Sequence, residues 1–501
     1  MAVTIIKPKR ETAQLALCLL AGALLGRIIL LDLKLKWELV FMTGLGIVFL
    51  SLVTGNPRGI LLFLAAFTTP FFFVKRLAER EVYVSQANEI NVGLMDVIGL
   101  ALLFLFFSEL ARRKTRIRFH PSVTVPAVAW LVLSSLSLLV ARDERLAVFQ
   151  LINMLKMILL YWIVANSVRD KSDLTFVITG LLFSLLFQAA VGVYQGATGR
   201  PAGFAVLGEE AMVPRQDIRG VAIHRVQGTF FHPNSYAMYL ITALPFGLIF
   251  LFAKVKSSLK AIAVAGLGLG IIALIYSLSR SGWISFLAIA CLVLGLAARR
   301  KRMSPRTMAL TGGLACIILA ALYFFGSGMI LGRIKADDHG SALSRILQAR
   351  TAMDIIRDHP VLGVGLNNYT LTSLLVLGRE PVVHNAYLLI AAETGLLGLL
   401  GFLGLLASLL FQNWRTARRA SDDLSWAAGA GIFCAFAAIA AHSMTDYALL
   451  GSTILITHFW FLAGVSSALS LGLSPRGQGP GRALNDVSKG TAAGHADRAR
   501  K

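Results

Sequence analysis

Long apolar runs alternate with short polar segments along most of this chain. The runs are 15 to 26 residues long, and an α-helix needs about 20 residues to cross the hydrocarbon core of a bilayer. The pattern predicts an all-α polytopic membrane protein, a bundle of about 12 to 14 transmembrane helices with a long, partly helical loop. The fourteen runs cover residues 13–31, 39–53, 59–74, 94–110, 123–140, 146–164, 174–194, 236–252, 261–277, 283–297, 308–325, 386–411, 424–441 and 448–471.

The composition supports the membrane assignment. Hydrophobic residues make up 56% of the chain and charged residues 15%, whereas about a quarter of a soluble globular protein is charged. The net charge of +22 is spread over loops beside the apolar runs, which favours anionic lipid headgroups over nucleic acid as partners. The cysteines lie inside predicted helices without paired spacing, which indicates neither disulfides nor zinc. No nucleotide-binding or metalloprotease motif is found, so we expect no cofactor and a substrate that carries its own energy.

The distribution of basic residues predicts the orientation. The densest short clusters, 112–118 and 299–306, share one side of the membrane, and basic short loops stay in the cytoplasm. This places the amino terminus inside, and the first run lacks a small-residue cleavage site, so we expect a retained helix. An even number of spans returns the carboxyl terminus to the cytoplasm, where the polar tail 472–501 is expected to be disordered.

Four polar stretches then emerge together on the outer side of the membrane. They are 195–234, 279–282, 326–385 and 442–446, and they hold several arginines and histidines. Ionisable groups gathered at one membrane surface indicate a functional site there.

Two arginines in these stretches are candidates for binding an anion. Arg225 precedes the helix entrance Pro233-Asn234, and the free N–H groups of a helix amino terminus also favour anions. Pro and Asn are equally ordinary residues for starting a helix. Arg280 lies in an outer turn so short that topology does not require a positive charge. Its alternative role is to reach lipid phosphates.

The longest outer stretch carries a predicted helix and a histidine. Residues 341–358 have near-helical apolar spacing, which predicts an amphipathic helix on the membrane surface, and Arg345 on it faces either the site or water. A glycine-rich turn ends at Tyr369. His384 and Asn385 stand at the mouth of the next span. A histidine there can act as a general base, although a lone histidine is more often structural.

Taken in order, these residues resemble the bacterial O-antigen ligase superfamily, which includes O-antigen ligases, Wzy-type polysaccharide polymerases and protein O-oligosaccharyltransferases. The resemblance extends from about residue 225 to residue 446. It rests on Arg225 with Gly228-Thr229-Phe230 and Pro233-Asn234, on Ser279-Arg280-Ser281-Gly282, on Arg345 before His359-Pro360-Val361-Leu362-Gly363-Val364-Gly365, and on His384-Asn385 before Glu393-Thr394-Gly395.

The resemblance implies a metal-independent glycosyltransferase at the periplasmic face of the bacterial inner membrane, with both termini in the cytoplasm. Its donor would be a glycan on undecaprenyl diphosphate and its acceptor lipid A-core or a glycan, with an O-antigen ligase as the first expectation. His384 would orient or deprotonate the acceptor hydroxyl, while Arg225 and Arg280 would hold the diphosphate. Further binding candidates are Arg345, Asn234, Asn385, Tyr369, His442 and Asp446.

The apolar runs and the resemblance together predict a division of the chain. Residues 1–194 would form amino-terminal transmembrane helices, and 195–471 an O-antigen ligase-like catalytic region with periplasmic loops 195–234 and 326–385. Residues 472–501 would form the cytoplasmic tail.

Two features differ from a typical O-antigen ligase. The predicted spans are more numerous, and the acid-bearing loop 75–92 has no counterpart, so a polymerase or exopolysaccharide role stays open. A transporter of lipid-linked glycans is the alternative from another class, and transporters show internal repeats and charges near mid-membrane. Lys156 is the clearest buried charge, with lipid or a carboxylate as its partner. No repeat relates the two halves, and the polar residues lie at one surface, which favours the enzyme.

Overall fold

The structure is a computed structural model that describes residues 55–79, 89–210, 214–215, 223–300, 341–375, 378 and 382–473. Within these residues, ten helices are long and apolar enough to cross a membrane, which confirms the all-α polytopic class. The expected spans 13–31, 39–53 and 308–325 and the tail from residue 474 lie outside the described residues. The ten are α4 Leu94–Ala111, α5 Pro121–Ser135 with the 3₁₀ turn η1 Leu136–Val140, α6 Glu144–Ser167, α7 Lys171–Thr198, α8 Pro233–Phe252, α9 Ser257–Tyr276, α10 Arg280–Arg299, α15 Ala386–Arg419, α16 Asp423–His442 and α18 Thr453–Ser470.

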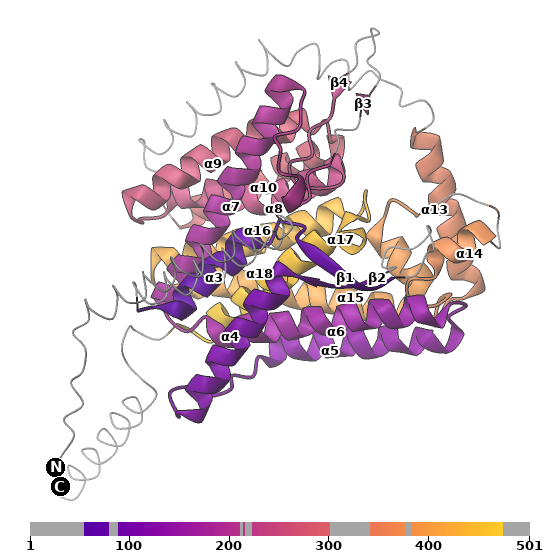
Figure 1. Cartoon of the computed structure of the whole chain (residues 1–501), viewed down its shortest axis with the longest axis horizontal. Coiled ribbons are helices and arrows are strands. Elements are labelled where there is room, and N and C mark those ends of the chain that lie inside the picture. Colours follow the sequence, from indigo (N-terminus) through magenta and orange to yellow (C-terminus); the bar gives the residue numbers. More distant parts are fainter. Residues whose placement is uncertain are drawn as a thin grey trace, which may run out of the picture.

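The two most buried spans, α8 and α18, lie in the middle of the bundle (Figure 1). Helix α8 packs against α7, α9, α10 and α16, and α18 packs against α6, α15 and α16. Between α6 and α18, the rings of Tyr161 and Trp460 meet edge to face with centroids 6.0 Å apart, a favourable aromatic geometry. The outer helices α4 and α5 instead expose apolar side chains such as Phe104 and Val125, as helices in contact with lipid do.

Side-chain caps set where several spans begin. Asp143, Asp170, Asn385 and Asp422 accept hydrogen bonds from the first backbone N–H groups of α6, α7, α15 and α16, groups that have no partner inside the helix. Pro233 opens α8, where its missing N–H costs nothing. The helix boundaries therefore follow from local chemistry.

The bundle has two polar ends. At one end, which we name the His384 end, lie the loops before α8, α10 and α15 and after α9 and α16. The side chain of Asn385 donates there to the Met444 carbonyl. At the opposite end lie the carboxyl ends of α8, α10 and α15 and the amino ends of α7 and α16. Arg300 donates a hydrogen bond there to the Ala420 carbonyl. The described parts of the four polar stretches thus share one end, as the sequence predicts.

Short elements gather at the His384 end. The predicted helix 341–358 is present as α13, which lies beside α14 on the right of Figure 1; its place on a membrane surface stays a prediction. A β-hairpin occupies the loop before α4, and its ladder contains a bulge between Arg76 and Ala78. The bounds are β1 Val74–Glu79, β2 Glu89–Gly93, η2 Ala205–Leu207, β3 Pro214–Arg215, β4 Ile223–His224, α13 Ser341–Asp358, α14 Tyr369–Leu375 and α17 Ala448–Gly451.

The predicted span 59–74 is too long. Helix α3 covers only Pro57–Thr68, and strand β1 begins at Val74. Pro70 has no N–H to donate, so the ladder of helical hydrogen bonds stops there, although Thr69 still has helical backbone angles. The apolar run continues because the next phenylalanines are half-buried against other aromatic rings, Phe71 against Phe187 with ring centroids 5.3 Å apart. Hydropathy alone does not distinguish such a half-buried, non-helical segment from the end of a span.

Two further breaks lie beside the loops of the His384 end. The predicted span 448–471 is divided at Ser452, which is extended and caps α18. Helix α15 is kinked at Gly395, whose φ of +67° suits glycine. A Cβ at Gly395 would lie 1.9 Å from the Val361 carbonyl oxygen, so this glycine lets the preceding loop pack directly on α15.

Candidate functional site

His384 lies just before α15, and Asp446 lies in the short loop between α16 and α17. The Nδ1 atom of His384 is 3.6 Å from Oδ2 of Asp446, which is ion-pair range but longer than a direct hydrogen bond. Asn385 joins the two segments, because its amide donates to the Met444 carbonyl at 2.9 Å and its Oδ1 caps α15. The rings of His384 and Tyr447 meet edge to face with centroids 5.4 Å apart. The imidazole is therefore held beside the carboxylate.

The carboxylate of Asp446 is buried and ionised. Its side chain is only 5% exposed. Oδ2 accepts from the Asn234 side-chain amide, and Oδ1 accepts from the Ala448 N–H, both at 2.9 Å. Burial opposes ionisation, but His384, His442 and the Asn234 amide outweigh it and lower the pKa of Asp446 to about 2. Asp446 therefore carries a negative charge at neutral pH.

Arg225 is connected to this pair through Asn234. The Nη2 of Arg225 donates to Asn234 Oδ1 at 2.8 Å, and its Nε donates to the Ser277 carbonyl at 2.9 Å. The polar groups thus form a chain from Arg225 through Asn234 and Asp446 to His384, although the positions span much of the sequence. Arg280 begins α10 directly after the turn that contains Ser277. Both arginine-bearing segments therefore meet at this end.

A cavity of about 510 Å³ opens beside the pair, a volume typical of small-molecule sites. Its lining includes His384, Asp446, Tyr447 and His232, the break between α17 and α18, and the β1–β2 hairpin. The imidazole is about one-third exposed, so it adjoins space that can hold a substrate.

His232 is a candidate that the sequence motifs did not single out. Its Nδ1 accepts the Asn234 N–H at 3.1 Å and caps α8, which requires a lone pair on Nδ1. Partial burial and the charge of Arg225 lower the pKa of His232, against the opposing charge of Asp446. The signal in the sequence was its place directly before the Pro233-Asn234 helix start.

The other predicted residues surround this centre. His442 ends α16, and its fully buried ring nitrogens have no hydrogen-bond partner. Arg345 is exposed on α13. Tyr369 is fully buried at the start of α14, where its N–H donates to Glu393 at 3.4 Å. None of these three is in the cavity lining described above, and their roles stay predictions.

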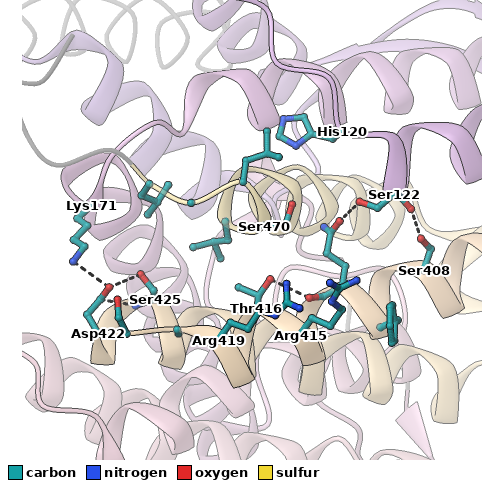
Figure 2. A pocket seen from close by; sticks show the side chains of 18 of the residues that line it. His120, Ser122, Lys171, Ser408, Arg415, Thr416, Arg419, Asp422, Ser425 and Ser470 are labelled. Atoms are coloured by element: carbon teal, nitrogen blue, oxygen red, sulfur yellow. Dashed lines mark hydrogen bonds and ion pairs between the residues drawn. The ribbon is translucent and has the colours of Figure 1, made fainter. Parts of the chain in front are cut away.

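A larger cavity, of about 870 Å³, lies at the opposite end of the bundle (Figure 2). Arg415 and Arg419 of α15 line it together with Lys171, which pairs with Asp422 at 3.0 Å. Its described lining includes none of the predicted site residues. Basic groups at the ends of spans suit lipid headgroups, so the larger volume does not mark the candidate site.

Fold and site together define a multi-pass helical membrane protein with a polar centre at one end of its bundle. Residues 263–403 match a family model described as O-Antigen ligase. This match confirms the predicted resemblance to the O-antigen ligase superfamily and indicates a glycosyltransferase of the O-antigen ligase or polymerase type. The matched region contains Arg280, Arg345 and His384, whereas Arg225 and Asp446 lie outside it. No match was found among curated proteins.

Proposed function

We propose that this protein transfers a glycan from undecaprenyl diphosphate to an acceptor hydroxyl, and that lipid A-core is the acceptor, as in an O-antigen ligase. The observation that carries the proposal is the ionised, buried Asp446 located 3.6 Å from His384 at the edge of a cavity. A carboxylate beside one ring nitrogen orients an imidazole and stabilises its protonated form, which leaves the other nitrogen available to accept a proton.

In the proposed reaction, the acceptor oxygen attacks the anomeric carbon of the donor sugar. His384 accepts the hydroxyl proton, the new C–O bond forms, and the bond to the diphosphate breaks with its electron pair on the leaving oxygen. The products are the elongated acceptor and undecaprenyl diphosphate, with inversion at the anomeric carbon. A positioned general base contributes roughly a hundredfold to ten-thousandfold to such a step.

Arg225 and Arg280 would stabilise the diphosphate as its charge grows. Guanidinium groups bind phosphate oxygens through paired N–H donors, and contacts that strengthen in the transition state accelerate the reaction. Arg225 already has fixed geometry from Ser277 and Asn234, so little reorganisation would be needed. The mainly basic opposite end supports a cytoplasmic position for that end and a periplasmic one for His384.

The test uses purified protein in detergent with a defined undecaprenyl-diphosphate glycan. Lipid A-core and a second copy of the glycan are offered as separate acceptors, and products are identified by mass spectrometry. Transfer to lipid A-core is the expected result. Transfer only between glycans would replace the ligase proposal with a polymerase. In a parallel assay with the protein reconstituted in vesicles, movement of the lipid-linked glycan across the membrane without a covalent product would replace the enzyme with a carrier.

A further inference from the structure

The β1–β2 hairpin, in the loop without a counterpart in the resembled ligases, forms a wall of the cavity beside His384. Arg76, Glu89 and Asn91 of the hairpin are part of the cavity lining. The Nε of Arg76 is 2.6 Å from Glu89 Oε2, and the Asn91 amide donates to Glu89 Oε1 at 3.1 Å. The wall therefore presents a carboxylate and a guanidinium group, and the buried Asn91 amide holds the carboxylate in place.

Lys156 fixes this wall to the transmembrane bundle. From α6, its Nζ donates to Asn91 Oδ1 at 3.2 Å and to the Asn91 backbone carbonyl at 2.9 Å. It also pairs with Asp96 at the start of α4 at 3.2 Å. Of the two partners predicted for Lys156, lipid or a carboxylate, the structure shows a carboxylate, and the hairpin supplies further hydrogen-bond acceptors. A wall anchored in this way is preorganised for binding.

An aromatic pair continues the wall into a second space. The rings of Phe72 and Phe231 meet edge to face with centroids 4.5 Å apart, and Phe231 remains 40% exposed. Both rings and Glu210 line the cavity beside His384 and also an adjoining cavity of about 240 Å³. The candidate site therefore extends past the aromatic pair, away from His384.

We propose that the hairpin wall and Phe231 form a sugar-binding subsite that selects the glycan next to the bond being transferred. This inference rests on the proposed function. Pyranose rings have hydroxyl edges, which donate to carboxylate oxygens such as those of Glu89. They also have apolar faces, which pack against an exposed aromatic ring such as Phe231. The sugar can belong to the donor lipid or to the acceptor, because both present the same chemistry.

The experiment compares wild type, Phe231→Ala and Glu89→Gln by native mass spectrometry in detergent. The probes are undecaprenyl diphosphate, undecaprenyl diphosphate carrying one N-acetylhexosamine, and free core oligosaccharide. Phe104→Ala is the aromatic control, because Phe104 is 73% exposed on α4, outside the cavity lining. Glu144→Gln is the carboxylate control, because Glu144 is an exposed residue at the same end of the bundle.

Wild type is expected to bind the lipid with a sugar more tightly than the bare lipid, or to bind the free oligosaccharide. Either cavity variant should weaken that sugar-dependent binding about three- to tenfold while binding of the bare lipid is unchanged. Loss on the sugar-bearing lipid assigns the subsite to the donor, and loss on the free oligosaccharide assigns it to the acceptor. Both controls should match wild type.

Retained sugar-dependent binding in both cavity variants would overturn the subsite, and so would its absence in wild type, while the proposed transfer reaction would stand. Failure of wild type to bind bare undecaprenyl diphosphate would instead overturn the proposed function, and the subsite with it. Unchanged binding of the bare lipid shows that each variant is folded, so loss of sugar binding reports on the wall itself.

Discussion

At the opposite end of the bundle, Arg58 contacts three carboxylates and Lys171 pairs with Asp422. At the His384 end, the buried carboxylate of Asp446 instead meets an imidazole and an amide. The first arrangement joins helix ends through ion pairs between basic side chains and carboxylates. At the His384 end, a buried negative charge lies beside a group that can gain or lose a proton. Such a pair is energetically unfavourable in a low dielectric, and pairs of this kind are common in active sites.

The cavities at the two ends lead to the same conclusion. The larger one is lined by flexible basic side chains and helix ends, where lipid headgroups are the simplest partners. The smaller one adjoins His384, Asp446 and a polar wall that is anchored by Lys156. Chemistry of the lining, and not volume, separates a candidate reaction site from a membrane contact.

The largest expected effect is from His384→Ala. Transfer should fall roughly a hundredfold to ten-thousandfold, because the acceptor hydroxyl loses its proton acceptor. Binding of undecaprenyl diphosphate should persist, since it depends on the arginines. Initial transfer rates and lipid binding measured on the same preparation check both statements. Transfer at the wild-type rate would show that His384 has no role in the mechanism. The assignment of the reaction site to the His384 end would then lose its basis.

Asp446→Asn should have the next largest effect, a loss of roughly tenfold to a hundredfold in transfer. The amide keeps the volume but removes the charge that orients and stabilises the imidazole. Because the pKa of Asp446 is lowered to about 2, its ionised form stabilises the fold at pH values above about 4, the ordinary carboxyl range. That stabilisation is lost as the pH falls from about 4 to about 2.

Thermal unfolding at several pH values tests this assignment. Wild type should be more stable than Asp446→Asn above about pH 4, and the difference should shrink below it. A gap that grows on acidification would show that Asp446 is protonated in the folded protein. Transfer rates over pH 5 to 9 should show no titration of Asp446 itself.

Much of the fold follows from periodicity and capping, but the contacts of the site do not. The apolar runs and polar stretches predict which residues share an end of the bundle. They do not predict that Asn234 contacts both Arg225 and Asp446, because that contact depends on how α8 packs against the α16 loop. Nor do they separate an asparagine that caps a helix, as Asn385 does, from one that binds a substrate.

The hairpin was missed for a related reason. Its first strand, Val74–Glu79, is short and contains a bulge, so the alternation of apolar and polar positions is weak. The apolar run before it extends the hydropathy signal past the end of α3. A distant residue, Lys156 on α6, donates hydrogen bonds to the hairpin's second strand, and no local pattern indicates that contact.

Arg280→Lys should reduce transfer about three- to tenfold. Lysine keeps the charge but loses the planar fork that matches phosphate oxygens. Helix α10 supplies its own control, because it begins at Arg280 and ends at Arg299 on the opposite end. Arg299→Lys should leave the rate unchanged. Equal rates in both variants would indicate that Arg280 only anchors the helix to headgroups.

The smallest effect is expected from the double variant Arg415→Ala with Arg419→Ala. These residues lie near the far end of α15, and at 1.5 Å per residue the segment after the Gly395 kink alone places them about 30 to 35 Å from that kink. Charges interact over about 8 Å at physiological ionic strength, so transfer should stay within about twofold of wild type. Co-purified phospholipid, measured by mass spectrometry, should fall in the variant if the larger cavity holds headgroups. A tenfold loss of transfer at an unchanged unfolding temperature would show that the two ends are coupled through α15. The kink at Gly395 would then be the first candidate for the element that transmits this coupling.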